Sequence, residues 1–100
     1  IQAGTYGAVM HYLKAVKTAG TDEAKAVMAQ MKKMPINDFM TKNGVVRADG
    51  RVIRDMYLME AKSPAESKGP WDLAKMVATV PGNEAFRPIN EGGCKLAASN

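Results

Sequence analysis

The chain has 100 residues, enough for one small domain. Its 46% hydrophobic and 24% charged residues are ordinary for a soluble globular protein, and they exclude a disordered chain, which would be poor in apolar residues. The net charge of +4 comes from scattered basic residues that lack the interleaved aromatic side chains of a nucleic-acid binder, so we expect no nucleic-acid partner.

No segment of the sequence has the features of a membrane span or a signal peptide. No apolar run approaches the ~20 residues that a membrane-spanning helix needs. No charged start precedes an apolar stretch and a cleavage site. Because the sequence begins with Ile1 and not with Met, we expect a processed chain or a piece of a longer one. The missing targeting segment therefore says little about the compartment.

The first 34 residues are expected to form a helical hairpin. Apolar residues in the first segment recur on one face of a 3.6-residue period: Tyr6, Val9, Met10, Leu13 and Val16. Gly20 is typical of the left-handed residue that ends a helix. Thr21 is expected to cap a second helix, whose first turn is favoured by Asp22 and Glu23. Pro35 forces that helix to stop.

The second helix carries methionines at helical spacing, at positions 28, 31 and 34. Methionine fills irregular gaps in cores and also serves on adaptable binding surfaces. The core is the usual location for such a stripe, and a binding surface is the alternative.

After Pro35 the pattern changes, and a loop with a β-hairpin is expected over residues 35–61. The dipeptide Asp49-Gly50 between two β-prone runs is a strong hairpin signal. The second strand is expected from Arg51 to Ala61. Both of its faces are largely apolar, so this strand should be covered on two sides.

The remainder is predicted to contain one more strand. Residues 62–71 form a loop rich in proline, serine and glycine. Residues 72–81 alternate as in a strand, which Pro81 and Gly82 end. Residues 82–100 have little periodicity and are expected to be an irregular tail. The whole chain, 1–100, therefore forms a single unit of the α/β class.

No arrangement of side chains in the sequence suggests catalysis. Capping explains Asp22 and Glu23, the turn explains Asp49, and Asp55 and Glu60 are expected on opposite strand faces. No carboxylate has a partner arrangement that favours catalysis, so we expect no enzymatic activity. His11 and Cys94 are the only residues of their types, and neither has the spacing of a metal site, so no metal or other cofactor is expected. Cys94 is expected to be a structural thiol. An oxidising compartment remains compatible if a partner cysteine lies outside this chain.

Several strings in the sequence carry a resemblance to a known family. YGAVMHYLKAV, AGTDEAKAVMAQMKK and NGVVRADGR occur in the family's order, and DMYLMEAKSPAESKGPWD is the most distinctive string. From Gln2 to Leu96, the chain resembles the C-terminal part of the periplasmic solute-binding proteins of ABC importers. The similar branch is the branched-chain amino acid type, also called the Leu/Ile/Val-binding or receptor-family ligand-binding type. Some of its members are similar to binders of aromatic carboxylates.

This resemblance implies the type I periplasmic-binding-protein fold. The intact protein would have two α/β lobes joined by three crossovers, with the ligand in the cleft between them. The chain would be the last part of that fold: two helices, a β-hairpin, a further strand and an irregular tail. Its implied function is to bind an amino acid or a related small carboxylate in the periplasm, close by a hinge, and deliver the ligand to an ABC permease.

The resemblance also implies candidate ligand-binding residues. In the family, the loop that enters the first of these helices lines the cleft, and here it comprises Gln2, Ala3, Gly4, Thr5 and Tyr6. Thr5 or Tyr6 would donate a hydroxyl to a carboxylate, beside free amides at the helix start. The alternative is that Thr5 caps the helix and Tyr6 packs. Near its end the chain departs from the branch, because it has Lys95 where the branch has proline.

Two other functions are compatible with the sequence. One is a regulatory ligand-sensing domain of the same fold, which would signal to a partner in place of a permease. The other is a small self-associating module without a ligand. If the chain is a piece of the binding protein, we expect it to form a homodimer or swapped oligomer through its uncovered strands, and to bind no ligand alone.

Overall fold

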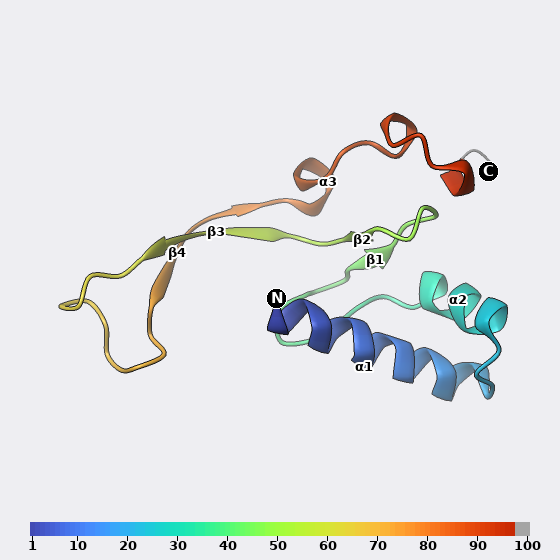
Figure 1. Cartoon of the computed structure of the whole chain (residues 1–100), viewed down its shortest axis with the longest axis horizontal. Helices are drawn as coiled ribbons and strands as arrows, with labels where there is room; N and C mark the ends of the chain where they lie inside the picture. Colours follow the sequence, from blue (N-terminus) through green and yellow to red (C-terminus); the bar gives the residue numbers. More distant parts are fainter. Residues whose placement is uncertain (98–100) are drawn as a thin grey trace.

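The structure is a computed structural model that describes residues 1–97 (Figure 1). The two long helices come first and are followed by four strands and three short helical turns. Their bounds are α1 (Gln2–Ala19), α2 (Ala24–Lys33), β1 (Val45–Val46), β2 (Val52–Ile53), β3 (Met56–Ala61), β4 (Ala74–Val80), α3 (Gly82–Ala85), η1 (Ile89–Glu91) and η2 (Lys95–Ala97). The mixed α/β class expected from the sequence is confirmed, although the expected irregular tail contains three helical turns.

Helices α1 and α2 pack against each other through one narrow face of each (Figure 1). Gly20 ends α1 in the left-handed conformation, with φ 69° and ψ 16°, as its position in the sequence predicts. His11 donates from Nε2 to the carbonyl oxygen of Met31 at 2.9 Å and so joins the two helices. The buried residues of the two helices are Gly7, His11 and Ala15 of α1 and Val27 of α2.

The apolar stripe of α1 does not face α2. Tyr6, Val9 and Leu13 are 49%, 51% and 52% exposed. The packed face instead follows Gly7, His11 and Ala15, which are four residues apart and therefore lie on one side of the helix. On this face His11 bonds to α2 and Gly7 lies against Asp38 in the loop that follows α2, so the larger apolar side chains point away from the hairpin.

Thr21 does not cap α2, which corrects the expectation from the sequence. Glu23 is the capping residue, and its carboxylate accepts hydrogen bonds from the amides of Lys25 and Ala26 at 3.1 and 2.8 Å. These two backbone hydrogen bonds lower the pKa of Glu23. The helix begins at Ala24, so the amides that need a partner lie beyond the reach of Thr21, which accepts from the amide of Glu23 at 3.2 Å.

The hairpin predicted at Asp49-Gly50 is present. Strands β1 and β2 pair antiparallel, with Val45 opposite Ile53 and Val46 opposite Val52. Gly50 has φ 85°, a conformation that glycine adopts without steric cost, and its amide donates to the carbonyl of Arg47 at 2.9 Å.

The single strand expected from Arg51 to Ala61 is two strands with different partners. β2 pairs with β1, whereas β3 pairs antiparallel with β4, from Met56 opposite Val80 to Ala61 opposite Ala74. The break lies at Arg54 and Asp55. There Asp55 Oδ1 accepts the amide of Gly82 at 2.9 Å, and a Cβ on Gly82 would lie 2.9 Å from the backbone of Arg54. This close crossing redirects the chain from one strand partner to the other.

The ribbon of β3 and β4 extends away from the helices (Figure 1). Every residue of β3 is exposed, so the cover expected on its two faces is not provided by residues 1–97. The buried apolar residues are few and lie between the helical hairpin and β1: Ala15, Val27, Ile36 and Val46. The radius of gyration is 16.7 Å, compared with about 13 Å for a compact domain of this length.

Candidate functional site

The five candidate ligand-binding residues form the first turns of α1 and not a loop before it. The helix begins at Gln2, after Ile1 as its N-cap, and no side chain caps it. The first hydrogen bond within the helix is donated by the amide of Thr5 to the carbonyl of Ile1 at 3.0 Å. The amides of Gln2, Ala3 and Gly4 therefore have no partner inside the helix, as helix geometry requires.

The hydroxyls of Thr5 and Tyr6 have different surroundings. Thr5 Oγ1 donates to the carbonyl of Ile1 at 3.3 Å, so Thr5 binds back along its own helix and does not cap the helix. Within residues 1–97, the hydroxyl of Tyr6 makes no hydrogen bond. The ring of Tyr6 lies 5.2 Å from the ring of Phe39, at an interplanar angle of 58°. This tilted geometry is favourable for an aromatic pair.

Phe39 reaches Tyr6 because a tight turn holds the loop between α2 and β1 against α1. Asp38 Oδ1 accepts the amides of Met40 and Thr41 at 2.9 and 2.7 Å. The other carboxylate oxygen packs on α1, since a Cβ on Gly7 would lie 2.8 Å from it. Phe39 follows Asp38 directly and is 73% exposed, so the turn presents an aromatic ring to solvent beside Tyr6.

Arg54 is the charged side chain that lies against the first turn of α1. A Cβ on Gly4 would be 3.6 Å from Arg54 Nη2, and Nη1 donates to Thr41 Oγ1 at 3.5 Å. Arg54 comes from the break between β2 and β3. Strand β3 supports the loop between α2 and β1, because the hydroxyl of Tyr57 donates to the carbonyl of Met40 at 3.2 Å.

Sequence reasoning did not connect Phe39 or Arg54 with the first turn of α1. Phe39 lies in a turn-rich stretch without periodicity, and Arg54 is one of the scattered basic residues. The one signal in the sequence is that Phe39 is an aromatic residue inside a turn-rich polar stretch. The contacts with α1 depend on packing between residues 33 apart (Tyr6 and Phe39) and 50 apart (Gly4 and Arg54).

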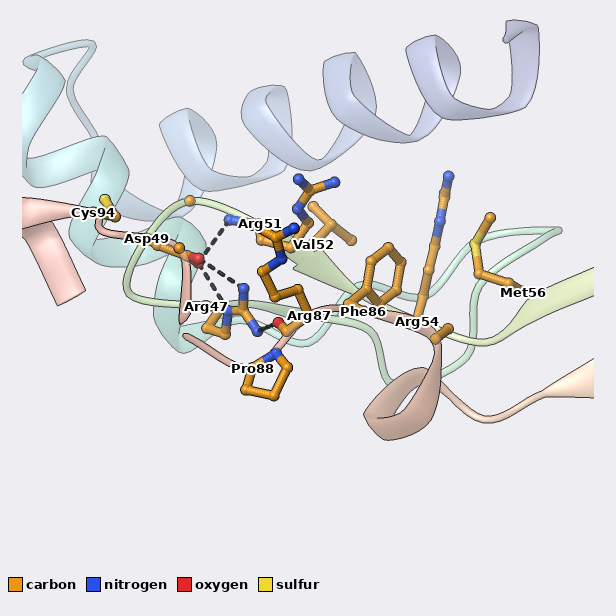
Figure 2. A pocket seen from close by; sticks show the side chains of 13 residues that line it. Arg47, Asp49, Arg51, Val52, Arg54, Met56, Phe86, Arg87, Pro88 and Cys94 are labelled. Carbon is orange, nitrogen blue, oxygen red and sulfur yellow. Dashed lines mark hydrogen bonds and ion pairs between the residues drawn. The ribbon is translucent and has the colours of Figure 1, made fainter. Parts of the chain in front are cut away.

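A pocket of about 940 Å³ lies between the β1–β2 hairpin and the tail (Figure 2). None of the five candidate residues lines it. Cys94 lies at its edge, half-buried and with a free thiol. Among residues 1–97, no three His, Cys, Asp or Glu side chains gather in a way that would hold a metal ion. No helix in this part of the chain has both the length and the apolar character needed to cross a membrane.

Comparison with known proteins identifies the family. The profile of the family described as "Periplasmic binding protein" matches residues 1–70. The chain therefore belongs to the periplasmic binding protein family, as its sequence strings suggested. This is a family of solute-binding proteins that are not enzymes. No curated protein matches the chain.

Two crystal structures are similar to nearly the whole chain. One is a periplasmic binding protein from Burkholderia mallei, with 55% identity over 95% of this chain and a TM-score of 0.86. The other is a branched-chain amino acid ABC transporter periplasmic ligand-binding protein from Burkholderia xenovorans LB400, with 42% identity over 96% of this chain and a TM-score of 0.88. The mixed α/β chain thus matches a part of the periplasmic-binding-protein fold.

The chain spans about a quarter of the length of these structures, 25% and 26% respectively. Most of the neighbouring fold in those proteins therefore has no counterpart here. The exposed faces of β3, β4 and α1 are consistent with this difference, because a strand ribbon with two apolar faces needs cover that residues 1–97 do not supply.

Proposed function

We propose that this chain is part of the substrate-binding component of an ABC importer, which acts in the periplasm and delivers its ligand to a membrane permease. The observation that carries the proposal is the 42% identity, over 96% of the chain, to a branched-chain amino acid ABC transporter periplasmic ligand-binding protein. Its role is binding and delivery, without a chemical change to the ligand and without a cofactor.

The ligand we propose is an amino acid or a related small carboxylate, including aromatic acids. The hydroxyl of Tyr6, which makes no hydrogen bond within residues 1–97, would donate to a carboxylate at the first turns of α1. Arg54 adds a guanidinium beside Gly4, and guanidinium groups bind carboxylates with two parallel hydrogen bonds. Tyr6 and Phe39 add an exposed aromatic edge for an apolar side chain or ring.

Tyr6 is the residue of the five that we expect to contact the ligand through its side chain. The hydroxyl of Thr5 is already engaged by the carbonyl of Ile1, whereas that of Tyr6 is not engaged within residues 1–97. Gln2, Ala3 and Gly4 would contribute their backbone amides. These assignments rest on the proposed binding role.

The test is calorimetric titration of the full-length gene product with leucine and with benzoate. We expect one of the two ligands to bind, and Tyr6→Phe to weaken its binding about tenfold through loss of one charge-assisted hydrogen bond. Thr5→Val should have a smaller effect. Tyr12→Phe is the matched control, because Tyr12 is a similarly exposed tyrosine on the same helix, and it should leave the affinity unchanged.

Two outcomes would count against different parts of this proposal. If neither leucine nor benzoate binds to the folded full-length protein, the proposed ligand class is wrong. If a ligand binds and the Tyr6→Phe and Tyr12→Phe variants bind it with the same affinity, the ligand class stands and the assignment of Tyr6 is wrong.

A further inference from the structure

All four arginines of the chain line one pocket. They are Arg47, Arg51, Arg54 and Arg87, and they surround the space of about 940 Å³ between the β1–β2 hairpin and the tail (Figure 2). None of the ten lysines lines it. Arginine differs from lysine in presenting a planar fork of donors that matches the two oxygens of a carboxylate or phosphate. A pocket lined by every arginine and by no lysine is therefore suited to recognise an oxyanion.

The pocket carries a large uncompensated charge. Among residues 1–97, Asp49 is the one acidic residue in its lining, so four arginine side chains against one aspartate leave three positive charges in this part of the chain. The ion pairs of the described residues do not include Arg51, Arg54 or Arg87. Glu84 and Glu91 are close in sequence to the tail residues of the pocket but do not line it.

Arg47 and Asp49 build the wall of the pocket. Arg47 donates from Nε and Nη2 to the two carboxylate oxygens of Asp49 at 2.9 and 2.7 Å. This pairing lowers the pKa of Asp49 to about 2 and raises the pKa of Arg47. Arg47 Nη1 donates to the carbonyl of Arg87 at 3.0 Å and so ties the tail to the hairpin (Figure 2). Arg47 is thereby engaged, and three guanidinium groups remain for a ligand.

Arg51 is oriented by an aromatic ring. Its guanidinium carbon lies 5.7 Å from the centroid of Phe86, within the range of a cation–π contact. Within residues 1–97, the side-chain N–H groups of Arg51 make no hydrogen bond, so they are available for another partner. Phe86 comes from the tail and Arg51 from the hairpin, so the same contact also joins the two sides of the pocket.

We propose that this pocket binds a small multivalent oxyanion, a molecule with two or more carboxylate or phosphate groups. Three unpaired positive charges exceed what a single carboxylate neutralises. The volume lies within the range of about 300–1,000 Å³ that is usual for small-molecule sites. Arg51 and Arg87 hold the anion directly. Arg54 also approaches Gly4, the proposed solute site, so it is left unchanged in the test.

The experiment titrates the full-length gene product at low salt with citrate and, separately, with pyrophosphate. Acetate at the same ionic strength is the monovalent control. We expect saturable binding of at least one multivalent anion and none of acetate, with an affinity that falls as sodium chloride is added. The citrate and pyrophosphate titrations together show whether the pocket prefers carboxylate or phosphate groups.

The variant Arg51→Gln/Arg87→Gln should weaken this binding by about tenfold or more, since each arginine supplies charge-assisted hydrogen bonds. Lys25→Gln/Lys33→Gln is the matched control: it removes the same charge from exposed positions on α2, away from the pocket, and should leave the affinity within about twofold. If the arginine double variant fails to fold, Arg51→Lys serves in its place, because it keeps the charge and loses the fork. It should weaken binding several-fold.

Three results would overturn the proposal. The first is that neither citrate nor pyrophosphate binds better than acetate, as would happen if an acidic segment of a longer chain fills the pocket. The second is that the arginine and lysine double variants lose affinity equally, which indicates general charge attraction. The third is that Arg51→Lys binds as tightly as the unmodified protein. Because Arg51 and Arg87 are not part of the proposed solute site, failure here leaves the importer role intact.

Discussion

At the scale of single residues, a few polar side chains close the turns that the backbone makes. Asp49 is the clearest case, since its carboxylate accepts two hydrogen bonds from the side chain of Arg47 and one from the amide of Arg51 at 3.1 Å. The side-chain bond from Arg47 is the main reason that the pKa of Asp49 falls to about 2 from an ordinary 3.8. Ionised Asp49 therefore stabilises the hairpin.

This pKa gives a prediction about pH. A carboxyl group whose pKa is lower in the folded protein stabilises the fold above its ordinary pKa and loses that effect as the pH falls through the folded value. Asp49→Asn should lower the thermal midpoint of the full-length protein at pH 7, and the difference should shrink between about pH 4 and pH 2. Calorimetry at a series of pH values measures it. A difference that stays constant to pH 2 would show that Asp49 does not act through its charge.

At the scale of elements, the decisive feature is the crossing at which β2 gives way to β3. Asp55 binds the amide of Gly82, and Gly82 lies so close to Arg54 that a Cβ would be 2.9 to 3.1 Å from its backbone atoms. Atoms at that distance are in steric conflict, and backbone cannot move aside as a flexible side chain can. Glycine is therefore needed at position 82 because it has no Cβ to clash with the backbone of Arg54, and not because of its backbone angles.

We predict that Gly82→Ala destabilises the full-length protein by about 1–3 kcal/mol through this overpacking. Gly69→Ala is the control, because no atom lies within 4 Å of a Cβ at that loop position, and its effect should be within about 0.5 kcal/mol. Urea unfolding of both variants tests the difference. Equal stabilities for the two variants would mean that the crossing relaxes to admit a methyl group.

At the scale of the whole molecule, residues 1–97 leave much apolar surface exposed. Leu58 and Met76 of the β3–β4 ribbon are 57% and 61% exposed, and Trp71 in the loop that joins the two strands is 90% exposed. An isolated two-stranded ribbon is at best marginally stable in water. Unpaired strand edges also template pairing with other chains. The isolated chain is therefore expected to associate with other chains.

We predict that the isolated 100-residue chain self-associates through the ribbon, as a homodimer or by exchange of elements between copies. Sedimentation velocity over a range of concentrations measures its state. A Leu58→Lys/Met76→Lys variant should shift the distribution towards monomer, because charges at an edge oppose pairing. A monomer at high concentration without these substitutions would contradict the prediction.

We also predict that the isolated chain binds neither leucine nor benzoate measurably. It spans about a quarter of the related structures, so the groups that would enclose a ligand on the other side of α1 are missing. Calorimetric titration of the chain and of the full-length protein, side by side, tests this. Tight binding by the chain alone would mean that the first turn of α1 forms a sufficient site.

Local sequence signals predicted much of the fold. Gly20 and the pair Asp49-Gly50 were found because left-handed and tight-turn conformations depend on the residue itself. The sequence places the cap of α2 two residues too early, at Thr21, because Thr21 and Glu23 are both able to cap and the choice depends on where the helix starts. The first turn of α1 was proposed by resemblance, and its neighbours Phe39 and Arg54 were not foreseen.

The sequence by itself determined the order of elements, the helical hairpin, the hairpin turn and the membership of a family, because each rests on residues close together in the chain or on distinctive strings. Only the tertiary structure decided which face of α1 packs, where the strand from Arg51 to Ala61 breaks, and that all four arginines share one pocket. These features depend on contacts between distant segments, such as Arg47 with Arg87, and periodicity carries no information about them.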